Sequence, residues 1–432
     1  MSPASNGGTA AAGSGSQPGT KPSKPSQPNL KQAAATASTR SILMGAIFLM
    51  ATSAIGPGFL TQTAVFTNQL AAAFGFAILV SIIIDIAVQM NVWRVIGISG
   101  LRAQELGNVV FPGLGYLLTA LIGIGGFVFN IGNIAGGGLG LNALLGIDAK
   151  IGGLITAGLA IIIFSIQRLG AALDKILVVL GVVMFALTIY VAFVSQPPVG
   201  EALTQTVWPE TVDWVVVTTL VGGTVGGYIT YAGAHRMLDS GTTGPENVKA
   251  VTRASVTAIV LTGVMRFVLF LAILGVVAGG IALNIDDNPA AEAFQAAAGD
   301  FGMRAFGAVL FAAALSSVIG ASYTSATFII PKKDHLRKAQ NIVTIVFIVA
   351  SATTFAFVGS APAALLVFAG AFNGLVLPVG FTMIIYVALF RQKDLLFGYN
   401  YPRWLIGLGM IGVVIAWFLA IRSFGGVWDF VF

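Results

Sequence analysis

From about residue 40 onward, the chain alternates between long apolar stretches and short polar connections. Many stretches reach 18 or more residues, the length that an α-helix needs to cross the hydrocarbon core of a bilayer. Hydrophobic residues make up 56% of the chain and charged residues only 9%, about a third of the charged share in globular proteins. The sequence therefore predicts an all-α polytopic membrane protein. We count eleven transmembrane helices, at approximately 43–74, 77–98, 116–145, 151–166, 176–194, 214–232, 256–278, 305–330, 342–358, 364–390 and 404–424.

The first 40 residues have a different composition from the rest. They are rich in Ser, Gly, Pro, Ala and Lys and show no apolar periodicity, which predicts a disordered tail over 1–40 and a transmembrane domain over 41–432. The tail lacks the apolar core and cleavage site of a secretory signal, so we expect it to be retained. The chain contains no cysteine, which excludes disulfides, thiolate metal sites and a cysteine nucleophile.

Basic residues show how the chain crosses the membrane. With the N-terminus in the cytoplasm, eighteen of the 22 Lys and Arg residues fall on the inner side, and Lys150, Arg304 and Arg422 fall outside. This bias predicts a multi-pass protein of the cytoplasmic (plasma) membrane, with a cytoplasmic N-terminus and an external C-terminus. The net charge of +6 is spread over short loops rather than gathered on one domain, so we expect no nucleic-acid partner.

Two apolar segments are interrupted by polar and helix-weakening residues. The first interruption is Gly56 to Gln69, and the second is Gly222 to Tyr231. They fall in helices 1 and 6, so five helices separate their starts. This spacing is typical of a 5+5 inverted repeat, here about 43–194 and 214–390, with an extra helix at 404–424. Discontinuous helices 1 and 6 predict a substrate site at the midplane and alternating access, as in a secondary transporter.

Several motifs resemble the Nramp divalent-metal transporters. Gly56-Pro57-Gly58-Phe59-Leu60 is similar to the start of that family's first helix, and Gly97 to Leu106 is similar to the end of its second. Further similarities are the run Leu141 to Ile147, the pair Ser316-Ser317 and the pair Leu377-Pro378. The resemblance covers about 43–424 and implies a LeuT-type fold and secondary transport.

The same resemblance shows where the metal chemistry is missing. We align the family's Asp-Pro-Gly-Asn with Thr67-Asn68-Gln69-Leu70, its Met-Pro-His-Asn with Gly226-Gly227-Tyr228-Ile229, and its two acidic residues in helix 3 with Asn130 and Asn133. All three sites become neutral, whereas a divalent cation needs carboxylates or several well-placed oxygens to offset its desolvation. We therefore expect no metal site and no cofactor.

The altered site favours a small organic anion. Half-helices that begin after Gln69 and after Tyr228 would present unpaired amides and positive dipole ends, which attract a carboxylate. Glycines allow close approach of a ligand, and hydroxyl, amide and aromatic side chains would complete the pocket. The candidate substrate-binding residues are Thr63, Phe66, Thr67, Asn68, Gln69, Asn130, Asn133, Thr224, Gly226, Gly227, Tyr228 and Tyr231. The chain also resembles an Nramp-like bacterial branch found near 5-oxoprolinase genes, which implies 5-oxoproline as a candidate substrate.

Coupling to an ion gradient needs further groups. Asp85 lies within an apolar helix and is the best candidate for a titrating group. Ser316 and Ser317 offer hydroxyl oxygens for sodium, so Na⁺ and H⁺ both remain possible coupling ions. Arg266 is also at membrane depth, where a structural ion pair with Asp85 is one expectation.

Two alternative functions stay open at this point. The chain could be a divergent divalent-cation transporter or a membrane sensor that does not transport. Glycine runs such as Gly136-Gly137-Gly138 are more typical of close helix packing than of a site, and Asn130 and Asn133 could bond to a neighbouring helix. An enzyme is not expected, because no nucleophile, acid pair or cofactor motif occurs.

Overall fold

The computed structural model describes residues 55–431, except 240, 332–333 and 359–361. All regular secondary structure in these residues is helical. The elements in chain order are α2 (Pro57–Leu70), η1 (Ala71–Ala73), α3 (Phe74–Ser99), α4 (Ala103–Val110), α5 (Leu114–Leu145), α6 (Ala149–Ser165), α7 (Gln167–Ser195), α8 (Val199–Val207), α9 (Trp214–Thr224), α10 (Ile229–Asp239), η2 (Pro245–Asn247), α11 (Val248–Ala278), α12 (Pro289–Ile329), η3 (Asp334–Leu336), α13 (Arg337–Val358), α14 (Pro362–Phe390) and α15 (Arg403–Val431). The expected tail over 1–40 and the start of the first helix at 43 lie outside the described residues.

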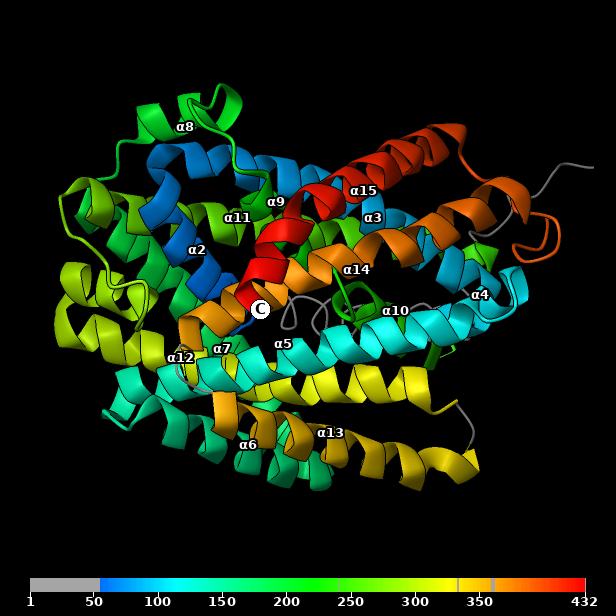
Figure 1. The fold of residues 1–432 in the computed structure, drawn as a ribbon, viewed down its shortest axis with the longest axis horizontal. Coiled ribbons are helices and arrows are strands. Elements are labelled where there is room, and N and C mark those ends of the chain that lie inside the picture. Colours follow the sequence, from blue (N-terminus) through cyan, green and yellow to red (C-terminus); the bar gives the residue numbers. More distant parts are fainter. Residues whose placement is uncertain (1–54, 240, 332–333, 359–361, 432) are drawn as a thin grey trace, which may run out of the picture. The chain divides into compact units, whose positions relative to one another are not determined.

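The number of membrane-crossing helices depends on how bent segments are counted. Within the described residues, eight helical stretches are long and apolar enough to cross a membrane, or nine with the bent pair Val179–Ser195 and Val199–Val207. The first stretch, Pro57–Ser99, has 43 residues and would be about 64 Å long as one helix, twice the hydrocarbon thickness. Figure 1 shows that the chain changes direction between α2 and α3. The count of eleven helices stays a prediction.

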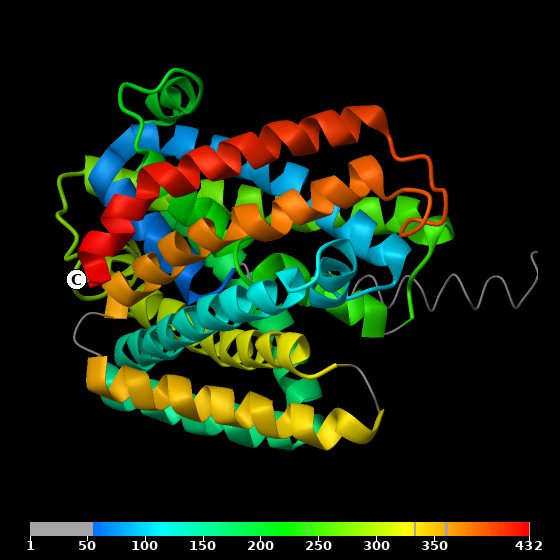
Figure 2. The same ribbon diagram turned by 45° about the vertical axis from the view of Figure 1, so that its right-hand side comes forward.

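The long helices run side by side, and α5 packs against α12, α14 and α6. On one side of α5 lie α14, α15 and α3, and on the other lie α12, then α6 and α13; Figure 2 shows the same order from a second direction. α2 contacts α11, α12 and α14, and α9 contacts α14 and α3. The two segments that carry the sequence interruptions are therefore enclosed by the other helices.

Two capping patterns explain where some helices begin. The Asp148 side chain accepts hydrogen bonds from the amides of Lys150 and Ile151 at the start of α6, and Asp213 does the same for Val215 and Val216 at the start of α9. Each carboxylate satisfies amides that have no partner within the helix and lies at the positive end of the helix dipole. These caps fix the ends of helices that polar loops would otherwise leave frayed.

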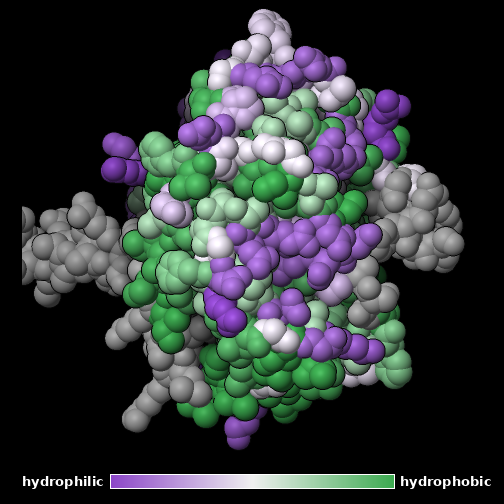
Figure 3. Space-filling view, turned by 90° about the vertical axis from the view of Figure 1, so that its left-hand side faces the viewer, coloured by the Kyte–Doolittle hydropathy of each residue, from purple (hydrophilic) through white to green (hydrophobic). Residues whose placement is uncertain are grey.

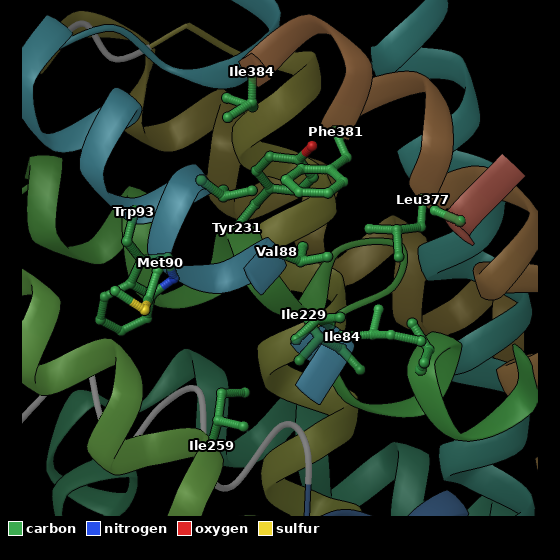
Figure 4. Packing of buried hydrophobic residues seen from close by; sticks show 14 of the residues in the cluster. Ile84, Val88, Met90, Trp93, Ile229, Tyr231, Ile259, Leu377, Phe381 and Ile384 are labelled. Atoms are coloured by element: carbon green, nitrogen blue, oxygen red, sulfur yellow. The ribbon is translucent and has the colours of Figure 1, made fainter. Parts of the chain in front are cut away.

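The helix α10 lies deep in the apolar core. Figure 4 shows Ile229 and Tyr231 of α10 beside Ile84 and Val88 of α3 and near Phe381 of α14. All five side chains are at most 3% exposed. Within a membrane bundle such packing stabilises the helix through van der Waals contacts rather than through removal from water, so the second half of the interrupted segment is packed closely against α3.

The connection between the expected helices at 176–194 and 214–232 contains a short helix, α8. Its axis is bent by 109° from the end of α7, and Ala202 and Gln205 are buried against the end of the bundle. α8 contacts η1 and α3. Figure 3 looks onto this end of the bundle, where hydrophilic residues gather across the middle and hydrophobic residues border them.

Candidate functional site

The interruption between α9 and α10 is formed by Val225, Gly226, Gly227 and Tyr228. α9 ends at Thr224, the Val221 carbonyl accepts hydrogen bonds from the amides of Val225 (2.9 Å) and Gly226 (3.0 Å), and α10 begins at Ile229. Gly227 has a φ of +53°, a left-handed conformation that glycine adopts without strain. A side chain at Gly227 would collide with Oδ1 of Asn373 on α14. This position therefore requires glycine for two independent reasons.

A glycine seam joins α9 to α14. A side chain at Gly222 would collide with the Gly370 carbonyl and the Gly374 amide, and one at Gly374 would meet the backbone of Thr218. The two backbones are therefore in direct contact. We call Gly222, Gly370 and Gly374 the glycine seam.

The sequence-based position of the first interruption is wrong. The interruption was expected over Gly56 to Gln69, with a half-helix that begins after Gln69, but α2 is a continuous helix from Pro57 to Leu70. Its polar residues satisfy themselves inside the helix: Thr63 Oγ1 donates to the Phe59 carbonyl (2.7 Å) and Thr67 Oγ1 donates to the Thr63 carbonyl (2.6 Å). Threonine in this arrangement is compatible with an unbroken helix.

The described part of this segment begins its helix at Pro57, with Gly56 as the N-cap. Proline is favoured at this position because its missing amide hydrogen would have no helical partner. The structure therefore places a helix start at the Pro57-Gly58 pair and no helix start at Thr67 to Leu70.

Three expected site residues lie away from the α9–α10 interruption. Phe66 packs on Phe74 with ring centres 5.9 Å apart, Asn68 is only partly buried, and Gln69 is exposed beside η1. The prediction that a half-helix starts after Gln69 fails because the helix ends at Leu70 and the chain turns through η1 into α3.

Buried polar atoms without a hydrogen-bond partner gather around the α9–α10 interruption. Among the expected residues these are Asn130 Oδ1, both amide atoms of Asn133, and the Tyr228 hydroxyl. Sequence reasoning missed Gln62 Oε1, Ser325 Oγ and Asn373 Oδ1, which are also buried without a partner in the described structure. We call Gln62, Asn130, Asn133, Tyr228, Ser325 and Asn373 the central polar cluster.

Contacts between five elements bring this cluster together. The Asn130 amide donates to Ser322 Oγ on α12 (3.1 Å), and the Asn373 amide donates to the Gly125 carbonyl on α5 (3.0 Å). The Tyr228 ring stands edge-on to Phe129 at 5.5 Å, and Asn133 lies beside its hydroxyl.

Gln62 and Ser325 complete the connection between the elements. Gln62 of α2 donates to the Leu366 carbonyl at 3.1 Å and lies against Gly223 of α9. Ser325 of α12 lies against Gly126 of α5. A signal for Asn373 was present in the sequence, because it is a polar residue within the most apolar stretch of α14.

Backbone amides add donors at both helix starts. Within the described residues, the amides of Gly58 and Phe59 at the start of α2 have no acceptor, and neither have those of Gly227, Tyr228 and Thr230 at the start of α10. Such amides, together with the helix dipole, favour an anion. An amide N–H donates hydrogen bonds and carries a partial positive charge, so these groups suit a carboxylate better than a cation.

Asp85 lies next to the interruption. It is 2% exposed, and its Oδ2 accepts a hydrogen bond of 2.5 Å from Thr224, the last residue of α9. Its Oδ1 has no partner in the described structure. Asp85 is thus joined by one hydrogen bond to the residue that directly precedes the α9–α10 interruption.

Arg266 does not form the expected direct pair with Asp85. The two side chains interact through their charges, but the described residues include no hydrogen bond between them. Instead the guanidinium of Arg266 lies 4.2 Å from the centre of the Phe59 ring, a cation–π contact. Phe59 belongs to the first turn of α2, so Arg266 also borders the site.

The remaining expected residues have different surroundings. Ser317 is buried and Ser316 is partly buried on α12, a helix that contacts α2. The ring centre of Tyr231 lies 5.4 Å from that of Phe328, in an edge-on contact, and 6.0 Å from that of His235. Tyr231 therefore belongs to the packed core around α10 rather than to the interruption. Thr224 contacts the site through its hydrogen bond to Asp85.

A second polar network, missed by sequence reasoning, closes the end of the bundle near Arg102. The Arg102 guanidinium pairs with Asp239 at 3.0 Å and donates to the carbonyls of Thr327 (2.9 Å) and Ile330 (3.2 Å). His235 Nδ1 lies 2.9 Å from Thr327 Oγ1. These bonds tie α10 to α4 and α12 on one side of the central polar cluster.

No group of three or more His, Cys, Asp or Glu side chains with metal-binding spacing occurs in the described residues. The central polar cluster offers amide and hydroxyl groups instead.

Comparisons with known proteins agree on family and fold. Two curated relatives are described as uncharacterized membrane proteins. YcsG of Bacillus subtilis is 50% identical over 386 residues, which cover 89% of this chain and 94% of YcsG. A protein of Haemophilus influenzae is 49% identical over 376 residues, which cover 87% of this chain and 94% of that protein.

Solved structures share the fold at low identity. A manganese transporter from Eremococcus coleocola matches with a TM-score of 0.67 and 17% identity, covering 90% of this chain and 87% of that one. MhsT in complex with L-phenylalanine matches with a TM-score of 0.63 and 17% identity, covering 87% of this chain and 98% of that one. These matches confirm the expected LeuT-type fold. The model of the family described as natural resistance-associated macrophage protein-like matches residues 47–425, and the chain therefore belongs to the Nramp family of membrane transporters.

Proposed function

We propose that this protein is a secondary active transporter of a small organic carboxylate or amino-acid derivative. The observation that carries the proposal is the central polar cluster, in which buried amide and hydroxyl atoms on four helices and in the α9–α10 interruption have no hydrogen-bond partner in the described structure. An unpaired buried polar group costs about 1–3 kcal/mol. A ligand with matching donors and acceptors would remove that cost when it binds.

The chemistry of the cluster suggests how such a ligand would bind. Its carboxylate would accept hydrogen bonds from the amides at the start of α2 or α10 that have no acceptor among the described residues. Asn133 offers both a donor and an acceptor, whereas Asn130 and Asn373 each offer an Oδ1 acceptor, because their NH₂ groups already donate to Ser322 and to the Gly125 carbonyl. A lactam, as in 5-oxoproline, presents one donor and one acceptor to such side chains. Phe129 and Tyr228 supply an apolar wall.

One structural neighbour was solved with a ligand of the proposed class. MhsT, which shares the fold, was solved with L-phenylalanine, and that ligand also carries a carboxylate. The Eremococcus coleocola neighbour is a manganese transporter, which keeps a divalent cation as the alternative substrate. The alternative is less favoured because amide oxygens alone do not offset the desolvation of a doubly charged ion.

Coupling to H⁺ or Na⁺ is part of the proposal. Asp85 contacts the last residue of α9 and carries an unpartnered carboxylate oxygen, so a proton on Asp85 would change the hydrogen bonding of the interruption. Ser316 and Ser317 remain the proposed sodium ligands, on the helix that packs against α2. The cytoplasmic membrane, with the N-terminus inside and the C-terminus outside, is the proposed location.

Calorimetry on the purified protein tests the substrate class. The titrants are 5-oxoproline, proline and glutamate on one side, and Mn²⁺, Mg²⁺ and Ca²⁺ on the other. We expect saturable binding of at least one carboxylate, and loss of that binding in Asn133→Leu. Saturable binding of a metal with no carboxylate response would contradict the proposal and favour the divalent-cation alternative.

Uptake into proteoliposomes tests transport itself. We expect accumulation of the bound carboxylate when a sodium or proton gradient is imposed, and no accumulation without either gradient. Binding without uptake under any gradient would favour a sensor that does not transport.

A further inference from the structure

A basic groove lies at one end of the bundle, away from the central polar cluster. It has a volume of about 590 Å³ and runs between α3, the start of α11 and the connection from α14 to α15. The residues that give it its chemistry are Arg94, Lys249, Thr252, Arg253, Tyr399 and Trp404. Nothing in the proposed transport site uses them.

Arg94 is the buried member of this groove. It is 6% exposed, and its Nη2 donates to Thr252 Oγ1 at 2.6 Å. Its Nε and Nη1 have no acceptor in the described residues. The guanidinium lies 5.6 Å from the centre of the Tyr401 ring, and Tyr401 is fixed by a 2.8 Å bond from its hydroxyl to Asn91 Oδ1. The Arg94 guanidinium is therefore held in the wall of the groove, and its positive charge is not neutralised by a carboxylate among the described residues.

The charge of the groove is positive. Lys249 and Arg253 are exposed on α11 and line it together with Arg94, whereas Glu246 is its one acidic lining residue. No ion pair between Glu246 and these cations occurs in the described residues. A buried guanidinium in the groove wall beside two exposed cations matches the negative charge of a phosphate group.

An apolar surface continues from the groove along the bundle. About two turns further along α11, Val260 and Leu261 are exposed, and on α15 so are Ile411 and Val414. Trp404, 62% exposed, lies at the edge of the groove, and tryptophan is typical of the bilayer interface. A ligand with a phosphate group and acyl chains would fill both regions.

We propose that the basic groove of Arg94, Lys249 and Arg253 binds a phosphate group, and that the apolar surface beside it favours the headgroup of an anionic phospholipid as its source. Phosphate bound here bridges α3 and α11, the helices that carry Asp85 and Arg266. The site would therefore stabilise the part of the bundle that surrounds the transport site.

Lipid binding to the full-length detergent-purified protein tests the groove. The probes are dioleoyl phosphatidylglycerol, dioleoyl phosphatidylcholine and inorganic phosphate, and binding is measured by native mass spectrometry and by the shift in melting temperature. We expect preference for phosphatidylglycerol over phosphatidylcholine. Lys249→Gln with Arg253→Gln should weaken phosphatidylglycerol binding at least about tenfold. Arg337→Gln with Lys338→Gln, which removes the same charge from exposed sites on α13, should leave it unchanged.

The remaining outcomes are also informative. Stabilisation by inorganic phosphate alone would support the site and assign it to free phosphate, whereas stabilisation by phosphatidylglycerol only would assign it to lipid. Arg94→Lys keeps the charge but loses the planar guanidinium, and we expect weaker binding in a folded protein. Equal loss in the α13 control, or no preference for phosphatidylglycerol and no phosphate binding in the wild type, would overturn the proposal.

Discussion

Thr224 Oγ1 donates a hydrogen bond of 2.5 Å to Oδ2 of Asp85, and this bond joins the end of α9 to the middle of α3. The same hydroxyl also lies 2.9 Å from the Leu220 carbonyl, one turn back in α9. A hydroxyl has a single hydrogen to donate, so it can satisfy only one of these acceptors at a time. The charge state of Asp85 therefore bears directly on how α9 ends.

Replacing Asp85 tests its role in coupling. Asp85→Asn keeps an oxygen that accepts from Thr224 but can neither carry a charge nor exchange a proton. We expect gradient-driven accumulation in proteoliposomes to fall about tenfold or more, the usual size of a coupling effect, while exchange of substrate at equal concentrations continues. Thr224→Ser, which keeps the hydroxyl, is the matched control. Full accumulation by Asp85→Asn would show that another group provides the coupling.

Gly227 should not tolerate even the smallest side chain. Gly227→Ala places a methyl group against Asn373 at a φ of +53°, and backbone strain of this kind costs about 1–3 kcal/mol. We expect a lower melting temperature and loss of substrate binding. Gly158→Ala is the control, because that glycine lies within α6 and a Cβ there meets no atom within 4 Å. If both variants behave alike, the close approach to Asn373 is unimportant.

Asn133 should separate stability from function. Neither of its amide atoms has a partner in the described structure, so Asn133→Leu removes a buried unsatisfied group and should raise the melting temperature while it abolishes substrate binding. Asn91→Leu is the contrast, because Asn91 bonds to the Ala87 carbonyl at 2.8 Å and to the Tyr401 hydroxyl at 2.8 Å. That variant should lose about 1–3 kcal/mol. A destabilised Asn133→Leu that still binds substrate would contradict both expectations.

Arg102 should control access to α10. The Arg102 side chain is 3% exposed in its ion pair with Asp239 of α10. Removal of a buried charge from such a pair leaves the other charge without its partner, which destabilises the contact between α10 and its neighbours. Because the chain has no cysteine, Ala234→Cys on α10 provides a single labelling site. We expect Arg102→Gln to speed maleimide labelling of that cysteine in detergent about tenfold, a change of about 1.4 kcal/mol in local opening.

The exposed pair of Arg391 and Asp394 is the matched control for Arg102. Its side chains are 27% and 50% exposed, and surface pairs contribute little. Arg391→Gln should leave the labelling rate of Ala234→Cys unchanged. Equal acceleration by the two variants would mean that any loss of positive charge at this end loosens α10.

Single cysteines also test the orientation in the membrane. Glu201 lies exposed on α8, and Lys338 lies exposed near the start of α13. We expect a membrane-impermeant maleimide to label Glu201→Cys in intact cells, and to label Lys338→Cys only after permeabilisation. The reverse pattern would place the N-terminus outside.

Much of the fold follows from the spacing of apolar and interrupting residues, because a bilayer allows few alternatives to helices. The position of the second interruption could be read from Gly226 and Gly227, which remove the Cβ atoms that disfavour a left-handed backbone. The first interruption was misplaced because Thr63 and Thr67 look like helix breakers in the sequence, yet their hydroxyls bond to carbonyls four residues earlier. Local hydrogen bonding of this kind leaves no distinct sequence pattern.

The candidate site was only partly predictable. Asn130, Asn133 and Tyr228 could be picked out because they are polar residues within or beside apolar helices. Gln62 and Asn373 gain their importance from contacts with Gly223 and Gly227, which are more than 140 residues away in the sequence. Such long-range contacts depend on how helices cross, and a single sequence does not specify this.

The glycine seam determines how α9 can move. Most helix pairs lock together because side chains of one fit between those of the other, so that sliding requires several side chains to change rotamer. At Gly222, Gly370 and Gly374 the two backbones are in direct contact, and the Thr218 and Thr219 side chains border them. Because α14 contributes no side chain at Gly370 and Gly374, we expect α9 to shift along α14 with fewer rotamer changes than at an interface of interlocking side chains.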